Sequence, residues 1–247
     1  MKNAFEESIS IIKKAREKGV ILRLFGGLAV KEHCGKDDFC EREHGDIDLI
    51  GLAYQSSAII DTIQGFGYHE NTDNTFASGG AHLLFEKSGS KDHIDVFLDK
   101  LRMEHEIDLS DRLNIEENTI SVSDILVCKL IIADLTEKDY RDILTLVKDL
   151  PLGEDDFPET INIKYIRELC AQNWGLQQDI ITSIDSCIDF MENYQFKDEV
   201  AQDIRKKFIA IKKAISDYPK SARWKLRSHI GKRLAWKKKV ELENREP

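Results

Sequence analysis

The chain has 247 residues, of which 41% are apolar and 33% charged, and its net charge is −9 at neutral pH. That composition is typical of a globular protein with one or two domains and a sizeable core. No apolar run approaches the roughly 20 residues of a membrane helix, and the N-terminus lacks the apolar stretch of a secretory signal. The sequence therefore predicts a cytoplasmic protein without membrane segments, whose five scattered cysteines are free thiols.

Strand and helix patterns alternate along the first hundred residues. Apolar, β-branched runs predict strands at residues 20–25, 46–51, 82–87 and 93–98. Amphipathic spacing predicts helices at residues 4–18, 28–34 and 56–64. The last two strands flank a short polar turn, so we expect them to pair as a hairpin. This order indicates an α+β fold with a short mixed sheet and flanking helices.

From Ser123 onward the apolar residues recur with the spacing of helices. We expect Ser123 to cap the first of these helices, and a further helix to cover residues 139–150. The strongest candidate for a linker is segment 151–158, which holds two prolines and a glycine. Because the pattern after it is helical, we predict a first domain over residues 1–150 and an all-helical C-terminal domain over residues 151–247.

Three aspartates on the predicted strands are the candidate metal ligands. Side chains alternate along a strand, so Asp46 and Asp48 share one face while Ile47 between them points into the core. Asp95 lies in a later apolar run of the same kind. Grouped carboxylates repel one another and suit Mg²⁺, a hard cation that prefers oxygen ligands. The alternative is that Asp-x-Asp is an ordinary pattern of surface strands and turns.

Gly26 and Gly27 close the first predicted strand and precede a short helix. Because glycine has no Cβ, the backbone N–H groups at this point can approach a phosphate closely. By itself a glycine pair indicates only a turn. Together with the aspartates it predicts a metal-assisted phosphoryl-transfer site.

The glycine pair followed by these aspartates resembles the nucleotidyltransferase superfamily, which includes polymerase beta. Its signature is Gly-Gly or Gly-Ser, a short helix, Asp-x-Asp on a strand and a third carboxylate on a later strand. Residues 26–30 and 42–49 are most similar to the aminoglycoside and lincosamide nucleotidyltransferases, which commonly read Gly-Gly-x-Ala and then Arg-x-His-x-Asp-[Ile/Leu]-Asp. Lys129-Leu130 and residues 138–142 are similar to a helical segment of the AbiEii-type nucleotidyltransferase toxins.

This resemblance implies transfer of a nucleoside monophosphate from a nucleoside triphosphate to an acceptor hydroxyl, with release of pyrophosphate. Asp46, Asp48 and Asp95 would hold a two-ion Mg²⁺ site and act as the catalytic residues, Asp95 also taking the hydroxyl proton. The nucleotide would be bound by Gly26, Gly27, Arg42, His44, Lys129 and Asp142. Where relatives often carry a serine this chain has Leu28, which removes a hydroxyl contact but leaves the backbone contact.

Several of these nucleotide contacts have a structural alternative. Arg42 and His44 fit a solvated loop equally well. Lys129 lies on an apolar helix face, where an ammonium needs an anionic partner unless it snorkels to solvent. Asp139 and Asp142 share a helical face and either orient Lys129, touch the nucleotide or pair with neighbouring bases.

Zinc is a rival metal near the aspartates. His33, Cys34, Cys40 and His44 are all zinc ligands by type, but their spacing matches no compact zinc motif. The other cysteines fall in predicted helices, where they are expected to act as small core residues. Mg²⁺ is therefore the favoured metal.

The C-terminal stretch from Tyr218 carries ten Lys or Arg against three Glu, a balance of +7, whereas the other 217 residues carry −16. Bases beside tryptophans favour contact with RNA, and the alternative is an amphipathic helix that packs Leu226, Ile230 and Leu234 on the body. The acceptor stays open between a small molecule, such as an antibiotic, and RNA or a protein, as in toxins that have an antitoxin partner. A further alternative is a catalytically inactive nucleotidyltransferase fold that binds RNA or a protein partner.

Overall fold

The computed structural model describes residues 4–34, 46–90 and 92–234. The chain forms two compact units. The first, here called the sheet unit, comprises Met1–Leu101, Ile107–Ile125 and Asp156–Glu159. The second, here called the helical unit, comprises Arg102–Glu106, Leu126–Asp155 and Thr160–Pro247.

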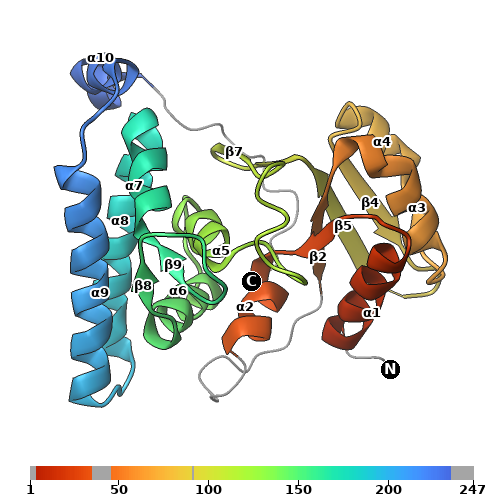
Figure 1. The fold of residues 1–247 in the computed structure, drawn as a ribbon, viewed down its shortest axis with the longest axis horizontal. Helices are drawn as coiled ribbons and strands as arrows, with labels where there is room; N and C mark the ends of the chain where they lie inside the picture. The colour runs from red at the N-terminus through yellow and green to blue at the C-terminus, as the bar shows by residue number, and fades with distance from the viewer. Residues whose placement is uncertain (1–3, 35–45, 91, 235–247) are drawn as a thin grey trace. The chain divides into compact units, whose positions relative to one another are not determined.

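The sheet unit is built on a five-stranded mixed sheet (Figure 1). Across the sheet the strands follow the order β1 (Leu22–Leu24), β2 (Ile47–Gly51), β5 (His93–Leu98), β4 (His82–Glu86) and β3 (His69–Glu70). Strands β2 and β5 are parallel, and the other neighbouring pairs are antiparallel. At the outer edge, the N–H of Leu24 donates to the carbonyl of Asn118 at 2.8 Å, so a later segment of the chain continues the sheet.

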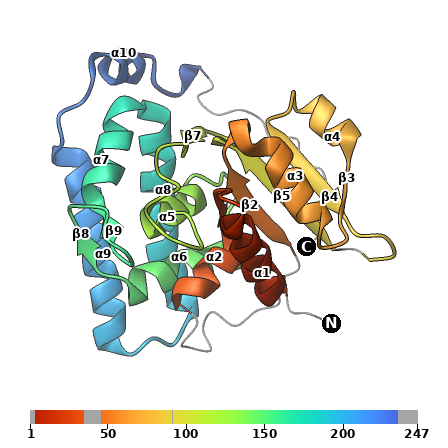
Figure 2. The ribbon, with the colours of Figure 1, turned by 45° about the vertical axis from the view of Figure 1, so that its right-hand side comes forward.

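Two helices of the sheet unit, α1 (Ala4–Glu17) and α3 (Ser56–Gln64), pack on each other and lie together on one side of the sheet in Figures 1 and 2. Ile11 and Ile12 of α1 and Ile59 and Ile63 of α3 are buried, and α1 contacts β1 and β2. The remaining short elements are α2 (Gly26–Cys34), η2 (Ala53–Gln55), α4 (Thr72–Ala77) and the paired strands β6 (Lys100–Arg102) and β7 (Glu106–Asp108). The core therefore lies on the face of the sheet that α1 and α3 cover.

The predicted α+β class with a short mixed sheet is confirmed. The four predicted strands correspond to β1, β2, β4 and β5, with β4 and β5 paired as the expected hairpin. The three predicted helices correspond to α1, α2 and α3. The two-residue β3, the six-residue α4 and the β6–β7 pair were not predicted, because segments this short show no measurable period.

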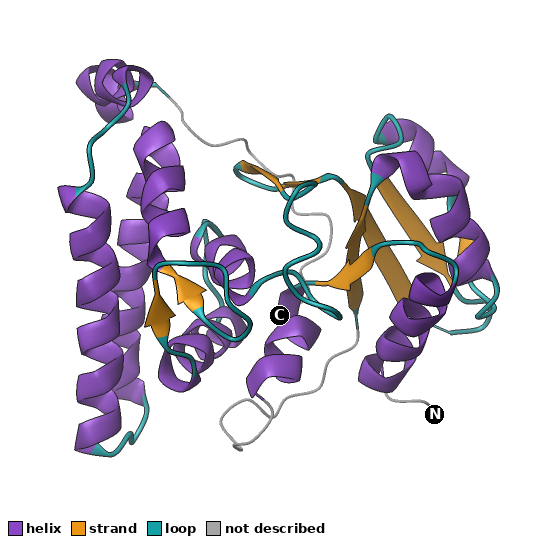
Figure 3. Ribbon diagram, in the orientation of Figure 1, coloured by secondary structure: helices purple, strands orange, loops and turns teal. Residues whose placement is uncertain are grey.

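In the helical unit, α6 (Glu137–Asp149), α7 (Ile163–Gln172), α8 (Trp174–Phe190) and α9 (Asp198–Asp217) pack together, and Figure 3 shows that helices predominate there. Their buried apolar side chains form the core of this unit. Helix α10 (Ala222–Ile230) packs on α7 and α8 and is followed by η4 (Gly231–Arg233). The short elements between the helices are β8 (Leu152–Gly153), β9 (Ile161–Asn162) and η3 (Met191–Asn193). The predicted helical character is confirmed, except that β8 and β9 form a small parallel pair. Within the described ranges, no helix is both long and apolar enough to cross a bilayer.

The boundary between the two units lies inside α5 (Val122–Leu130), so residue 150 falls within the helical unit. Helix α6 belongs there because it packs against α8 and α9. The residue that caps α5 is Ser121, whose hydroxyl accepts the N–H of Asp124 at 3.2 Å and donates to its carboxylate at 2.6 Å. The predicted cap at Ser123 is therefore wrong. The cap is Ser121, two residues earlier, because its hydroxyl makes the capping hydrogen bonds.

A charged network holds the last residues of the predicted linker segment, from Asp156 on, in the sheet unit. Arg112 donates from Nε to both carboxylate oxygens of Asp124 at 2.9 Å. It also donates to both oxygens of Asp156 at 2.9 and 3.1 Å. The side chain of Asp124 is 0% exposed, and the forked guanidinium can satisfy two carboxylates at once. The chain thus returns to the sheet unit at Asp156 through an ion pair.

A second buried pair explains why the tip of the β6–β7 turn belongs to the helical unit. His105 at this tip makes a 2.7 Å hydrogen bond to Asp179 of α8, and its side chain is 2% exposed. The backbone N–H of Ala133 donates to Glu104 beside it at 3.3 Å. Side-chain contacts, and not the sequence order, therefore decide the unit to which residues 102–106 belong.

We predict that Arg112→Met lowers the free energy of unfolding by about 3–5 kcal/mol, because it leaves the buried Asp124 carboxylate without its cation. Lys14→Met is the matched control, since Lys14 pairs with Glu17 on the exposed surface of α1. Urea unfolding of both variants measures the difference. Equal midpoints for the two variants would show that the Arg112 network contributes no more than a surface pair.

Candidate functional site

The register of β2 against β5 brings the predicted carboxylates to one face of the sheet. Asp48 stands opposite Asp95 in the parallel pair. Asp46 precedes Asp48 by two residues and lies just before β2 begins, at the same side. Ile47 and Ile94 point to the other face, where both are buried in the core. The three predicted ligands therefore gather at neighbouring positions on the face opposite to the core.

Two histidines join these carboxylates. The imidazole Nε2 of His82 lies 2.7 Å from Oδ1 of Asp95, which is a strong hydrogen bond. The Nε2 of His93 lies 3.5 Å from Oδ2 of Asp95 and 3.5 Å from Oδ1 of Asp46. The side chains of His82 and Asp95 are 24% and 21% exposed, whereas that of Asp46 is 66% exposed. The site is thus open to solvent on the side of Asp46 and more enclosed at Asp95.

The glycine pair meets the same face. Gly26 and Gly27 are the first residues of α2, and the first-turn N–H groups of a helix have no partner within the helix. Gly26 has φ +69, and a Cβ added there would lie 2.4 Å from Oδ2 of Asp48. The N–H of the preceding Phe25 donates to the carbonyl of Asp48 at 3.1 Å. A residue without a side chain is therefore required where α2 begins against this carboxylate.

Three rings form a row beside the site. The imidazole of His82 stacks on Phe97 with centroids 4.6 Å apart and an interplanar angle of 25°. Phe97 in turn meets the ring of Phe25 edge-on at 5.5 Å. Because Phe25 is next to Gly26, the row connects the start of α2 with the histidine that binds Asp95. Packing of these rings limits the movement of the start of α2 and of the His82 imidazole relative to each other.

The carboxylates fit Mg²⁺ by type, although they form no complete cage. Among the residues that the structure describes, no group of three or more His, Cys, Asp or Glu is arranged to hold an ion. Mg²⁺ is usually bound by one or two carboxylates together with substrate phosphates and water, so a cage of protein ligands is not required. Asp48 and Asp95, in register, and the exposed Asp46 supply hard oxygen ligands. They would hold the ion together with a bound triphosphate.

Lys129 and its two carboxylate partners form a separate cluster in the helical unit. Its Nζ donates to Asp139 at 3.0 Å and lies 2.8 Å from Asp142, and all three side chains are at most 12% exposed. Asp139 also accepts the N–H and hydroxyl of Thr136 at 3.1 and 2.8 Å, which closes the N-terminus of α6. The interpretation in which the aspartates orient Lys129 thus matches the contacts, and its role in nucleotide binding stays a prediction.

The cluster shifts the pKa of its members in opposite directions. Burial alone would lower the pKa of Lys129, but the charges of Asp142 and Asp139 together outweigh it and raise that pKa above its ordinary value. Burial alone would raise the pKa of Asp139, but the Lys129 ammonium and the Thr136 hydrogen bonds bring that pKa below its ordinary value. Both shifts favour the charged ion pair.

Several predicted residues lie outside the described ranges. They are Arg42 and His44, proposed for the nucleotide, and Cys40, considered for zinc. Of the zinc candidates that are described, Cys34 is buried and His33 makes a 2.7 Å hydrogen bond to Thr119. Burial lowers the pKa of His33. These contacts are those of core residues.

The two site histidines were missed in the sequence. His93 and Asp95 are two residues apart on one strand, and strand alternation alone puts them on the same face. This signal was present in the predicted hairpin. His82 could not be found in this way, because its contact with Asp95 depends on the register of β4 against β5.

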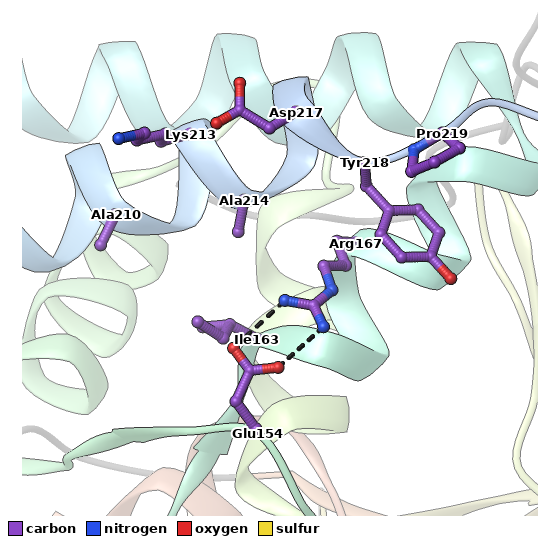
Figure 4. A pocket seen from close by; sticks show the side chains of 9 residues that line it. All are labelled: Glu154, Ile163, Arg167, Ala210, Lys213, Ala214, Asp217, Tyr218 and Pro219. Atoms are coloured by element: carbon purple, nitrogen blue, oxygen red, sulfur yellow. Dashed lines mark hydrogen bonds and ion pairs between the residues drawn. The ribbon is translucent and has the colours of Figure 1, made fainter.

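A pocket of about 440 Å³ lies in the helical unit. Residues of α7 and α9, together with Glu154 and Tyr218, line it (Figure 4). Arg167 reaches into it, where it binds both oxygens of Glu154 at 3.1 and 2.8 Å and packs on the ring of Tyr218. No residue predicted from the sequence to bind metal or nucleotide lines it. In this pocket the charge of the Arg167 guanidinium is balanced by the Glu154 carboxylate.

The basic helix α10 exposes part of its apolar stripe. Leu226 and Ile230 of α10 are 71% and 37% exposed, and Leu234, which follows η4, is 58% exposed, so these residues do not pack on the body as the amphipathic alternative required. The helix is held instead by Arg227, which lies 5.0 Å from the centroid of the Trp174 ring, and by the N–H of Ser221, which donates to Ala171 at 3.1 Å. The predicted core contacts of the apolar stripe are therefore wrong.

No family model and no curated protein sequence matches this chain. Similar solved structures include the lincomycin-bound lincosamide antibiotic adenylyltransferase LnuA, with 19% identity over 57% of this chain and 94% of that one, and a TM-score of 0.43. The antibiotic-resistance factor ANT(2'')-Ia has 14% identity over 57% and 80% of the two chains, with a TM-score of 0.39. An antigenic nucleotidyltransferase-like protein from Paracoccidioides brasiliensis has 12% identity over 89% and 95%, with a TM-score of 0.46. At these identities the chemistry has to be argued from the residues of this chain.

We predict that Gly26→Ala is more destabilising than Gly19→Ala. Both glycines have positive φ, +69 and +72, which costs alanine about 1–2 kcal/mol. A Cβ at Gly19 meets no described non-neighbouring atom within 4 Å, whereas one at Gly26 would meet Asp48 at 2.4 Å and displace its carboxylate. Urea unfolding of both variants isolates this steric term. Equal losses of stability would mean that α2 can move away from Asp48 without cost.

We predict that Lys129→Met lowers the free energy of unfolding at neutral pH by about 3–5 kcal/mol, because two buried carboxylates lose their shared cation. The raised pKa of Lys129 keeps its contribution intact below its ordinary pKa of about 10.4 and loses it as pH rises further. The lowered pKa of Asp139 keeps its contribution intact above about pH 3.9 and loses it as pH falls further. Urea unfolding of wild type and Lys129→Met across pH should therefore show the largest difference in the free energy of unfolding between these two pH limits.

The matched control is Lys206→Met, which removes an exposed charge from α9. It should leave stability nearly unchanged at every pH. A difference between wild type and Lys129→Met that is independent of pH would contradict the role of the ion pair.

Proposed function

We propose that this protein is a metal-dependent nucleotidyltransferase that moves a nucleoside monophosphate from a nucleoside triphosphate to an acceptor hydroxyl and releases pyrophosphate. The observation that carries the proposal is the register of β2 on β5, which sets Asp48 beside Asp95 on the face where α2 begins at Gly26. Carboxylates at a helix N-terminus with a glycine start combine a place for cations with a place for phosphate. The motif resemblance of residues 26–30 and 46–49 supports the same chemistry.

The residues of the sheet unit divide this work between them. The backbone N–H groups of Gly26 and Gly27 would bind the β- and γ-phosphates at the positive end of α2. Asp46, Asp48 and Asp95 would hold Mg²⁺ with the triphosphate, and the bound metal would neutralise phosphate charge and acidify the acceptor hydroxyl. Asp95 would accept the hydroxyl proton as the acceptor oxygen bonds to the α-phosphorus. The bond from the α-phosphorus to the bridging oxygen would break, and pyrophosphate would take its electron pair.

The acceptor is proposed as one of two classes. A small molecule, as in antibiotic modification, is supported by the similarity of residues 42–49 to aminoglycoside and lincosamide nucleotidyltransferases. RNA or a protein, as in a toxin with an antitoxin partner, is supported by the Lys129 segment and by the +7 stretch from Tyr218 to the C-terminus. In the second class, the exposed bases of α10 would contact phosphates.

One observation favours a second candidate function, a binding module without catalysis. His93 lies 3.5 Å from both Asp46 and Asp95, so an imidazole already stands between two of the three carboxylates. In that case the sheet unit would bind nucleotide, or a partner, without transferring the nucleoside monophosphate. Transfer of label separates the two functions.

The test is the transfer of label from each of the four α-labelled ribonucleoside triphosphates, with Mg²⁺, into total RNA, a pool of small metabolites or the protein itself. We predict that Asp46→Asn and Asp48→Asn each reduce transfer by roughly 10²–10³-fold, because each removes a ligand charge without adding bulk. Asp61→Asn on α3 is the matched control, since it removes an exposed aspartate of the same unit away from the site.

Loss of transfer with chelator and its return with Mg²⁺ would support the metal. Wild-type protein that binds triphosphate but transfers no label to any acceptor would favour the binding module. Full activity of folded Asp48→Asn would overturn the assignment of the site.

A further inference from the structure

We propose that His82 is a positioning residue that holds the carboxylate of Asp95 in one orientation and directs its second oxygen toward Asp46. This inference rests on the proposed function, because Asp95 is there the proton acceptor. His82 comes from β4 and Asp95 from β5, and the hairpin between these strands brings them together.

The two oxygens of Asp95 have different surroundings. Oδ1 lies 2.7 Å from Nε2 of His82, within the range of a good hydrogen bond. Oδ2 lies 3.5 Å from His93, beyond that range, and the same imidazole is 3.5 Å from Asp46. Oδ1 is therefore the anchored oxygen, and Oδ2 is the oxygen on the side of Asp46.

An aspartate on an open sheet face needs such an anchor. The terminal torsion of an aspartate is broad and roughly two-fold, so an unanchored carboxylate rotates and exchanges its oxygens. One short hydrogen bond to Oδ1 removes this freedom and leaves Oδ2 pointing in a constant direction. A proton acceptor or a metal ligand works best when it is held in this way, before the substrate binds.

The imidazole can act as an anchor because it is itself held in place. It stacks on Phe97 at 4.6 Å, and Phe97 meets Phe25 edge-on at 5.5 Å. Phe25 is fixed to β2 by the hydrogen bond from its N–H to the carbonyl of Asp48 at 3.1 Å. The rings of His82, Phe97 and Phe25 thus connect the carboxylate of Asp95 with strand β2, which carries Asp48.

His93 does not share this role. Its side chain is 37% exposed, against 24% for His82, and its Nε2 lies 3.5 Å from Asp95, whereas that of His82 lies 2.7 Å from the same carboxylate. Substitution of the two histidines should therefore have different effects. The role of anchor belongs to His82.

The experiment compares His82→Ala, His82→Gln and Phe97→Leu with wild type. The amide nitrogen of glutamine can reach the place of the imidazole Nε2, so His82→Gln should restore the hydrogen bond in part. His69→Ala is the matched control, because His69 is an exposed histidine on the edge strand β3 of the same sheet. The readouts are kcat and KM for the triphosphate, the Kd of Mn²⁺ alone by electron paramagnetic resonance, and the melting temperature.

We predict that His82→Ala lowers kcat by about 10–100-fold and weakens Mn²⁺ binding by about 10-fold, with little change in KM. His82→Gln should recover most of both losses, Phe97→Leu should lie between, and His69→Ala should match wild type. If His82→Ala does not fold, His82→Gln and Phe97→Leu decide by the same readouts.

Equal kcat and Mn²⁺ affinity for His82→Ala and His69→Ala would overturn this inference while leaving the proposed function in place. Wild-type protein that transfers no label would overturn the proposed function instead. In that case the Kd of Mn²⁺ decides whether His82 still positions Asp95. An unchanged Mn²⁺ Kd in His82→Ala would refute the positioning role of His82.

Discussion

The parallel pairing of β2 with β5 is the constraint on which the candidate site depends. It sets Asp48 opposite Asp95 and, by strand alternation, Ile47 opposite Ile94 in the core. A slip of one residue would exchange these two faces, so that carboxylates would enter the core and isoleucines would meet solvent. Burial of the apolar face therefore specifies the register, and the register in turn specifies the site. The energy that places the aspartates comes from residues that take no part in their chemistry.

Charged groups are fully paired in the core but only partly paired, and partly exposed, at the candidate site. Asp124 is fully buried and bound by the fork of Arg112, and Lys129 is shared by two carboxylates at 3.0 and 2.8 Å. In both cases each buried charge is balanced by an opposite charge within the protein. Asp95, in contrast, is anchored at one oxygen and partly exposed, and it neighbours an Asp46 that is 66% exposed. Incomplete satisfaction at an accessible place is what distinguishes a candidate site from a structural ion pair.

Long-range contacts also decide how the chain is divided. Segment 151–158 has the composition of a linker, yet Asp156 is bound to Arg112 within the sheet unit. The tip of the β6–β7 pair belongs to the helical unit through His105 and Asp179. Composition indicated a single boundary at residue 150, because prolines and acids are visible locally. The side-chain contacts Arg112–Asp156 and His105–Asp179, which decide this division, join residues more than forty positions apart and leave no local pattern.

The sequence by itself determined the order of the main strands and helices and the gathering of Asp46 and Asp48 on one strand face, because alternation and helical spacing are local properties of the chain. It also predicted that Gly26 and Gly27 lie between the first strand and the short helix α2. Only the tertiary structure decided that Gly26 closes on Asp48, that His82 reaches Asp95 and that Lys129 is held by carboxylates. These contacts depend on strand register, helix approach and side-chain packing between distant segments, which no local pattern specifies.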